Sequence, residues 1–256
     1  MFRSKDSYSV QSVEKALDIL EALADESVDA TLPHLAELLG ISRNKAFRLL
    51  ATLESRGLVE REEQSGVYRI GLSTVGLAQR FINSASLIRH AHPVMEELAR
   101  KHAEAVYLTV MLGEEVLFLD MVDCAQSVKT APLVGKKFPF FTNAAGKVLK
   151  ALESGDLLEK FFKKSRRKMA PAELERLESE LDEIRRKGVA VDCNGLGDGI
   201  IGVAVAVKDY AGKVVGALTL LGPAFRLLTD RLEEEIIPSL VEGAELLSVK
   251  FGYAKL

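Results

Sequence analysis

LPHLAELLGISRNKAFRLLATLESR, residues 32–56, is the stretch that decides the fold of the N-terminal part of this chain. Counted from its first residue, the small side chains of Ala36 and Ala46 take the fifth and fifteenth positions, and Gly40 takes the ninth. Ala36 allows two helices to approach closely, and Gly40 allows the left-handed backbone that ends a helix. Ile41 fills the corner between them. This spacing predicts a helix-turn-helix.

The second helix of this motif is predicted to end at Gly57 and to have two different faces. Its apolar residues recur at helical spacing and form a buried stripe. The stripe comprises Ala46, Leu49, Leu50 and Leu53. The other positions are small, polar or basic, as a helix that enters the major groove of double-stranded DNA requires. The predicted DNA-contacting residues are Ser42, Arg43, Asn44, Lys45, Phe47, Arg48 and Ser55, with Ala51 and Thr52 on the same side.

A two-stranded hairpin is predicted after the motif, because residues 58–71 alternate apolar and polar on both sides of a turn at 64–66. Arg61 and Arg69 on this hairpin are candidates for phosphate contacts. The alternative is that they are solvated strand charges among glutamates, and the sequence favours neither. A first helix over 9–24, capped by Ser9 or Ser12, completes a winged helix-turn-helix. Its apolar stripe is predicted to contain Val13, Leu17, Leu20 and Leu23.

The rest of the chain predicts an α+β fold with an antiparallel sheet flanked by helices. We expect a DNA-binding domain over 1–72, a linker helix over 73–86 and a ligand-binding domain over 87–256, with the boundary near Ser84. Helices are expected over 73–104 (broken at 84–87, with a new segment from Pro93), from Thr142 or Asn143 to Leu152, over 171–187 and over 229–251. Strands are expected over 105–112, 114–123, 189–192, 200–208 and 213–221, with a loop over 131–141.

Composition excludes several functional classes. The net charge of -3 argues against nonspecific coating of nucleic acid, which needs a strongly basic surface. Cys124 and Cys193 are expected to be free thiols, and the four histidines are too scattered for a metal site. No apolar run is long enough for a membrane span or a signal peptide, so we expect a cytoplasmic protein with no membrane partner.

No cofactor is expected. Gly197, Gly199 and Gly202 spell GxGxxG, but a strand follows them instead of the helix that a dinucleotide site requires. Two alternatives to a regulator stay open: a small-molecule-processing enzyme, and a dimeric scaffold that uses the helix-turn-helix for packing. No nucleophile with a nearby base supports the enzyme. The polar face around Asn44 and Arg48 argues against the scaffold.

Five stretches resemble the IclR family of bacterial transcriptional regulators, in matching order and spacing. The resemblance implies a winged-helix DNA-binding domain, a linker helix that helps to dimerise, and a GAF-like effector-binding domain. It also implies a homodimer or a dimer of dimers on a pseudo-palindromic operator, controlled by a small organic or aromatic acid. The stretches are SVQSVEKALDIL (9–20), LPHLAELLGISRNKAFRLLATLESRGLV (32–59), YRIGLSTVGLA (68–78), FPFFTNAAGKVLKA (138–151) and VAVAVKDYAGKVVGALTLLGPAFRL (203–227).

The resemblance also implies an effector pocket. Residues 143–146 would hold an anion at a helix N-terminus. Asp192 stands where relatives that bind keto acids carry a pocket aspartate, although an ordinary turn residue is the alternative. Gly202, Thr219 and Leu221 replace a cysteine and two serines of those relatives, which favours a larger, more apolar ligand such as an aromatic acid. The predicted effector-binding residues are Leu133, Val134, Phe138, Phe140, Asn143, Ala144, Ala145, Gly146, Asp192, Gly202, Thr219 and Leu221.

Overall fold

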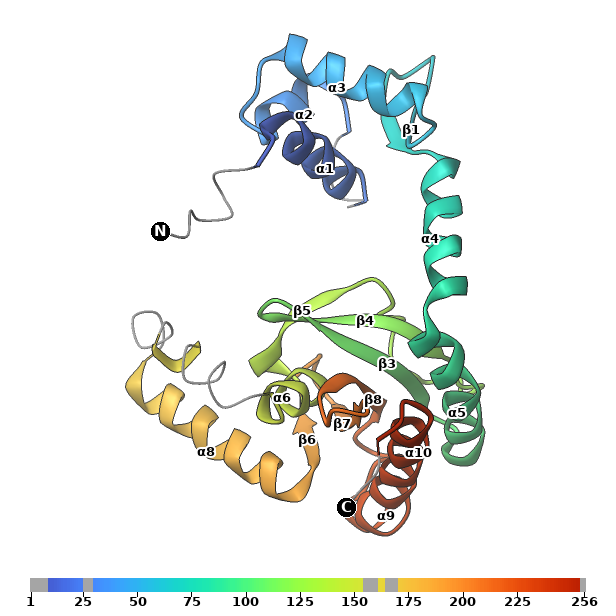
Figure 1. Cartoon of the computed structure of the whole chain (residues 1–256), viewed down its shortest axis with the longest axis vertical. Helices are drawn as coiled ribbons and strands as arrows, with labels where there is room; N and C mark the ends of the chain where they lie inside the picture. Colours follow the sequence, from blue (N-terminus) through green and yellow to red (C-terminus); the bar gives the residue numbers. More distant parts are fainter. Residues whose placement is uncertain (1–8, 25–29, 154–160, 164–169, 254–256) are drawn as a thin grey trace. The chain divides into compact units, whose positions relative to one another are not determined.

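The computed structural model describes residues 9–24, 30–153, 161–163 and 170–253. The chain divides into two compact units, residues 1–85 and 86–256 (Figure 1). Within the described ranges, no helix is both long and apolar enough to cross a lipid bilayer. The first unit contains α1 (Gln11–Leu23), α2 (Leu32–Leu38), α3 (Arg43–Ser55), β1 (Val59–Arg61), β2 (Tyr68–Ile70) and α4 (Leu72–Ser84).

The turn between α2 and α3 has the geometry that the sequence predicts. Gly40 adopts a left-handed φ of 61°, and the Ile41 N–H donates to the Ala36 carbonyl at 3.0 Å, which closes the end of α2. Ala36 and Ala46 are buried between the helices. The strands β1 and β2 pair antiparallel, with Glu60 opposite Arg69. The predicted winged helix-turn-helix is therefore confirmed.

The buried side of α1 agrees with the prediction only in part. Ile19 is fully buried in the core of the first unit, whereas Val13 and Leu17 are 56% and 55% exposed. Ala16 and Leu23 lie three and four residues from Ile19 on the same side of the helix. Together with Leu20 they pack around that core, as predicted for Leu20 and Leu23. The predicted cap is also wrong, because α1 begins after Val10 and has no side-chain cap. Burial of Ile19 sets the rotation of the helix about its axis. Apolar residues at helical spacing also occur along the neighbouring side of α1, at Val13 and Leu17, so the sequence could not show which side is buried.

The second unit is built on one six-stranded sheet with the strand order β5-β4-β3-β8-β7-β6. Every neighbouring pair is antiparallel, as predicted. Its elements are α5 (Ser86–His102), β3 (Ala105–Leu112), β4 (Glu115–Val122), β5 (Lys137–Pro139), η2 (Phe140–Thr142), α6 (Ala144–Ala151), α8 (Pro171–Lys187), β6 (Val189–Cys193), β7 (Ile200–Lys208), β8 (Val214–Pro223), α9 (Thr229–Arg231), η3 (Leu232–Ile236) and α10 (Ile237–Lys250).

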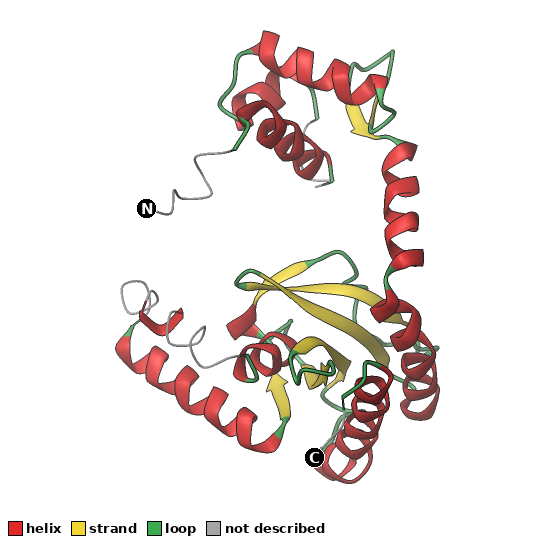
Figure 2. Cartoon of the chain, in the orientation of Figure 1, coloured by secondary structure: helices red, strands yellow, loops and turns green. Residues whose placement is uncertain are grey.

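Helices cover both faces of this sheet (Figure 2). α6 packs across β3, β7 and β8, and α8 packs outside it, whereas α5 and α10 cover the other face. Alternate strand residues point to opposite sides of the sheet, and in the central strands both sets are apolar and buried. In β3, Val106 and Leu108 belong to one face, and Ala105 and Tyr107 belong to the other. The sheet is therefore a buried middle layer that can carry a site on either face.

Three boundaries differ from the predictions. Pro93 lies inside α5 and does not start a segment, because burial of Ala91 and Met95 favours continuation of the helix past the missing N–H. The predicted loop over 131–141 contains β5, a strand of three residues with no detectable period. The last predicted helix contains a π-helical turn, η3, between α9 and α10.

Candidate functional site

The exposed side of α3 is the candidate DNA interface. Phe47 is 51% exposed, so its ring is available to a partner. Arg48 is exposed beside it, and the Ala51 side chain leaves room for a close approach. A surface depression of about 670 Å³ runs along this side of the helix. Its lining residues are Ser12, Ser42, Asn44, Lys45, Phe47, Arg48, Leu49, Ala51 and Thr52.

Three hydroxyl groups in this interface bond the main chain of α3, and that of Thr52 donates to the Arg48 carbonyl at 2.7 Å. The Ser42 Oγ atom accepts from the Lys45 N–H at 3.2 Å and caps the N-terminus of α3. The Ser55 hydroxyl donates to the Thr52 carbonyl at 2.8 Å near the other end. Ser42 therefore holds the first turn of α3, the turn that carries Arg43 and Asn44.

Both arginines of the hairpin contact groups of the hairpin. The Arg61 guanidinium lies 5.7 Å from the centre of the Tyr68 ring. Arg69 lies 3.5 Å from the Glu62 carboxylate, and both side chains are exposed. Exposed contacts of this kind contribute little to stability, so these arginines can exchange them for phosphates at little cost.

Strand register brings the predicted effector-binding residues of the sheet together. Asp192 is opposite Gly202, and Gly202 is opposite Leu221, so these residues form one row across β6, β7 and β8. Thr219 lies two residues before Leu221 on the same face and is opposite Tyr107 of β3. Two neighbouring rows therefore form the floor of the candidate effector site.

The other predicted effector-binding residues lie above this floor, with one exception. Leu133, Phe140 and Ala145 are buried in the same apolar cluster as Leu221. Val134 is half exposed and does not join them. Gly146 packs directly on the main chain of Phe140, since a Cβ atom at this position would lie 2.3 Å from the Phe140 carbonyl oxygen. The other predicted residues on this side of the sheet are Phe138, which is partly buried, and Asn143 and Ala144, which are buried. Together with Leu133, Phe140, Ala145 and Gly146 they form the roof of the candidate site.

The first turn of α6 is capped by the chain's own side chains. The Asn143 Oδ1 atom accepts from the Gly146 N–H at 3.0 Å. The Asp192 carboxylate accepts from the Ala144 N–H, and from the Gly195 N–H at 3.3 Å. Asp192 is therefore a buried residue and not an exposed turn residue, and its carboxylate fills the position at the N-terminus of α6 in which an effector anion is predicted.

Burial changes the acidity of Asp192. It raises the pKa of this carboxyl above its usual value of 3.8, and the Ala144 N–H and the Lys147 ammonium oppose the rise. Lys147 is itself paired with Glu180 of α8 at 2.7 Å. Protonated Asp192 can donate a hydrogen bond to an acidic ligand, whereas the carboxylate repels one.

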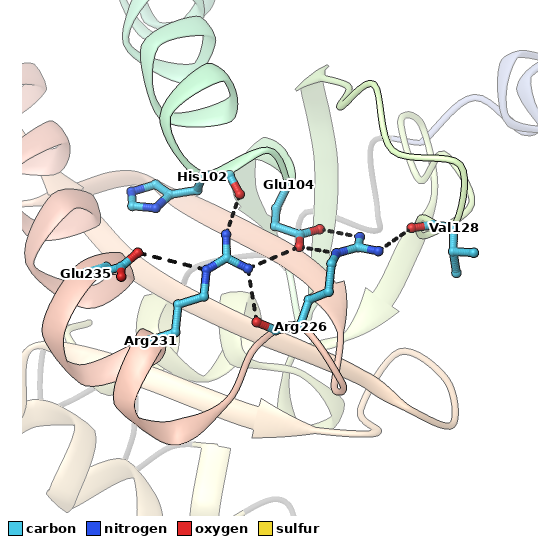
Figure 3. A network of polar contacts seen from close by, with 6 residues as sticks. All are labelled: His102, Glu104, Val128, Arg226, Arg231 and Glu235. Carbon is cyan, nitrogen blue, oxygen red and sulfur yellow. Dashed lines mark hydrogen bonds and ion pairs between the residues drawn. The ribbon is translucent and has the colours of Figure 1, made fainter.

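A buried ion-pair network lies at the start of β3 (Figure 3). Glu104 is 1% exposed and accepts two hydrogen bonds from Arg226, at 2.6 and 2.7 Å. Arg226 also donates to the Val128 carbonyl at 2.8 Å, and Arg231 donates to the His102 carbonyl at 2.5 Å. The network joins the end of α5 and the segment after β8 to the loop of residues 123–136, which contributes Leu133 to the roof.

Sequence reasoning missed Tyr107 and Thr130. Tyr107 is fully buried and Thr130 is 7% exposed, and burial raises the pKa of the Tyr107 phenol while the neighbouring Thr130 hydroxyl opposes the rise. Alternation in β3 could have identified Tyr107, because it shares a face with Ala105 and Thr109. No local pattern marks Thr130 or the Glu104 network, since both depend on contacts between segments far apart in the chain.

Two family models match the chain. The model described as IclR helix-turn-helix domain matches residues 12–63, and the one described as Bacterial transcriptional regulator IclR C-terminal matches residues 79–249. The HTH-type transcriptional regulator KdgR of Escherichia coli (strain K12) is 28% identical over 253 residues, which cover 97% of this chain and 95% of that protein. The transcriptional repressor IclR of the same organism is 26% identical, over 95% of this chain and 90% of that protein.

Solved structures match both units. An IclR transcriptional regulator from Alicyclobacillus acidocaldarius has a TM-score of 0.84 and 26% identity, covering 94% of this chain and 99% of that one. An IclR homologue from Microbacterium hydrocarbonoxydans, complexed with 4-hydroxybenzoate, has a TM-score of 0.78 and 21% identity, with coverage of 94% and 99%. The second likeness is evidence for the fold alone. From the two models and these relatives, the chain belongs to the IclR family of DNA-binding transcriptional regulators, which carry an effector domain and are not enzymes.

Proposed function

We propose that this chain binds a pseudo-palindromic DNA operator through the exposed side of α3, as a dimer or a dimer of dimers. The observation that carries the proposal is the exposed, partly basic α3 face with Phe47 and Arg48 at its centre. Arg48 has the donors that read guanine in the major groove, and the Phe47 ring suits the methyl group of thymine. With few cations on each helix, two half-sites about one helical turn apart supply the affinity together.

Exposed apolar side chains support self-association. Val13 and Leu17 of α1 are exposed, and so are Leu72, Val75 and Leu77 of α4. Apolar side chains that remain exposed at helical spacing are typical of an interface with another chain. A dimer of this kind would hold two α3 helices at a fixed separation, which a pseudo-palindromic operator requires.

We further propose that a small organic or aromatic acid binds in the second unit and changes operator affinity. The site would be formed by the sheet residues Gly202, Thr219 and Leu221 below and by Leu133 and Phe140 above. The apolar character of these walls supports an aromatic acid over a short keto acid. An effector that prefers one arrangement of the two α3 helices by about 1 to 3 kcal/mol would change operator affinity by about 5- to 150-fold.

The deciding experiment is the selection and sequencing of genomic DNA fragments retained by the purified full-length chain. The expected result is a common sequence with two related half-sites. Arg48→Ala is the matched control and should not enrich that sequence. Fragments without a shared sequence would contradict the operator proposal.

The effector proposal has a separate test. The full-length chain is screened by thermal shift against short keto acids, dicarboxylates and aromatic acids, including 4-hydroxybenzoate. A ligand that binds only the native state raises the melting temperature. At 100 times its Kd it increases the free energy of unfolding by about 2.7 kcal/mol. Stabilisation by keto acids alone would contradict the aromatic class without affecting the operator proposal.

A further inference from the structure

A pocket of about 450 Å³ lies at the end of the sheet where β7 extends beyond β6 (Figure 1). The first residue of β6, Val189, is opposite Val205, so the last three residues of β7 pair only with β8. The pocket at this open edge is also lined by the end of α8 and by the last turns of α10. None of the predicted effector-binding residues lines it, so it is separate from the candidate effector site.

The end of α8 brings basic side chains to this edge. Gly188 takes a left-handed φ of 75° and its N–H donates to the Ile184 carbonyl at 2.7 Å, so the helix ends here and the chain turns into β6. The last turn before it contains Arg185, Arg186 and Lys187, and all three line the pocket. The helix dipole favours cations in this turn, so their presence alone does not indicate a ligand.

A fourth cation reaches the same pocket from a different element. Lys208 is the last residue of β7, and its position does not depend on a helix dipole. Its ammonium group lies 5.5 Å from the centre of the Tyr253 ring, which also lines the pocket. The Lys208 N–H donates to the Ser248 hydroxyl at 2.9 Å, and that hydroxyl donates to the Ala244 carbonyl at 2.7 Å. These bonds fix the main chain of Lys208 against α10.

The positive charges of the pocket exceed its negative charges. Arg185 and Lys187 each pair with a carboxylate of α8. Within the described part of the chain, neither the Arg186 guanidinium nor the Lys208 ammonium forms a hydrogen bond or an ion pair. Glu245 also lines the pocket and has a contact of its own. Two unpaired cations outweigh one carboxylate together with roughly half a negative charge at the helix end, so the pocket attracts an anion.

The inner wall of the pocket is apolar. Val205 and Ala206 of β7 are 7% and 8% exposed, and Ala244 of α10 is 2% exposed. Leu152 and Val241 are partly buried and line the same pocket. A small inorganic anion would leave this surface in contact with water, whereas an acyl chain or a ring would cover it. The pocket therefore suits a ligand with an apolar part as well as a charge.

We propose that this pocket binds an amphiphilic carboxylate, an apolar chain or ring that bears one acid group. The carboxylate pairs with Arg186 and Lys208, and the apolar part contacts Val205, Val241 and Ala244. A guanidinium suits this partner because two of its N–H groups match the two carboxylate oxygens. The bound ligand joins the end of α8 to α10. This site is additional to the proposed effector site and does not depend on it.

The test compares octanoate with octanamide, its neutral isostere, by calorimetric titration of the full-length chain. Octanoate is expected to bind about fivefold or more tightly, and its affinity should fall as salt is raised from about 0.1 M to about 1 M, while that of octanamide should not. Arg186→Gln and Lys208→Met should each weaken octanoate binding by about threefold or more and leave octanamide unchanged. Arg176→Gln, on the exposed side of the same helix, is the matched control and should keep the wild-type affinity.

Hydrogen exchange of the full-length chain with and without octanoate locates the ligand. Protection is expected at the end of α8 and along the last turns of α10. Protection confined to the first turn of α6 would place octanoate in the candidate effector site and contradict the proposal. No octanoate binding, equal affinity for both probes, or unchanged octanoate affinity in Arg186→Gln and Lys208→Met would also overturn it. Operator selection and the screen of aromatic acids are independent of these outcomes and still test the proposed function.

Discussion

The Asp192 carboxylate accepts a hydrogen bond from the main-chain N–H of Ala144, the first residue of α6. The contact joins β6 to the helix that covers the candidate effector site, across 48 positions of sequence. A carboxylate at a helix N-terminus is stabilised by the helix dipole. Burial acts in the opposite direction and is the larger influence, since the pKa of Asp192 is raised.

The first prediction concerns pH. Because the folded pKa of Asp192 lies above its usual value of 3.8, its contribution to stability is fully present below that value and is lost as pH rises through the folded pKa. Asp192→Asn cannot ionise, so its free energy of unfolding should fall less over that range than that of the wild type. Urea unfolding from pH 3.5 to 7 measures the difference. Asp198→Asn, in the exposed loop after β6, is the control, and curves for Asp192→Asn parallel to the wild type would refute the assignment.

The second prediction concerns the Glu104 network. Arg226→Met leaves a carboxylate that is 1% exposed without its bidentate partner, and should lower the free energy of unfolding by about 3 to 5 kcal/mol. The double variant with Glu104→Leu should recover much of that loss, because no buried charge remains. Arg176→Met, on the exposed side of α8, should change stability by less than about 0.5 kcal/mol. Additive losses in a double-mutant cycle would show that the two side chains are not coupled.

The third prediction uses two helical glycines. A Cβ atom on Gly146 would lie 2.3 Å from the Phe140 carbonyl oxygen and 2.4 Å from its Cα atom, so Gly146→Ala should destabilise by about 1 to 3 kcal/mol or more. Gly76 of α4 has nothing within 4 Å of such an atom, and Gly76→Ala should be neutral or stabilise by up to about 1 kcal/mol. Denaturant midpoints of the two variants give the comparison. A stable Gly146→Ala protein would mean that α6 does not pack this closely on Phe140.

The fourth prediction separates helix capping from DNA contact at Ser42. Ser42→Ala removes the bond to the Lys45 N–H and should lower the stability of the first unit by about 1 kcal/mol. Ser42→Asp can still cap α3 and should keep that stability, but its negative charge should weaken operator binding beside the phosphates. Thermal unfolding and gel-shift titration are measured on both variants. If Ser42→Asp binds the operator as tightly as the wild type, Ser42 lies away from the DNA backbone.

The fifth prediction concerns the reading of a base by Arg48. Arg48→Ala should lower operator affinity by about 1 to 3 kcal/mol and relax the preference for one base pair in each half-site. Lys45→Ala, a change expected to remove a phosphate contact, should weaken binding similarly for all sequences and reduce the salt dependence. Gel-shift titrations with operator variants distinguish these patterns. An Arg48→Ala protein with unchanged base preference would exclude Arg48 from base recognition.

Local sequence patterns were sufficient for the helix-turn-helix and for most secondary structure of the second unit. Gly40 predicted the turn between α2 and α3 because few other residues adopt its left-handed backbone. The buried stripe of α8 has the same kind of local origin, because Leu174, Leu177, Leu181 and Ile184 repeat at the period of a helix. Such features depend on backbone conformation and on spacing within one element, and both can be read from the sequence.

Tertiary structure alone decided the rotation of α1, the continuation of α5 through Pro93 and the role of Asp192. Each depends on a partner far away in the chain: the core around Ile19, the sheet under Met95, and the Ala144 N–H. The sequence by itself determined the type and approximate position of most elements and the family that the chain resembles. Only the packing of β3 beside β8 brought Tyr107 opposite Thr219, because strand order and register are set by the burial of whole faces and not by any local pattern.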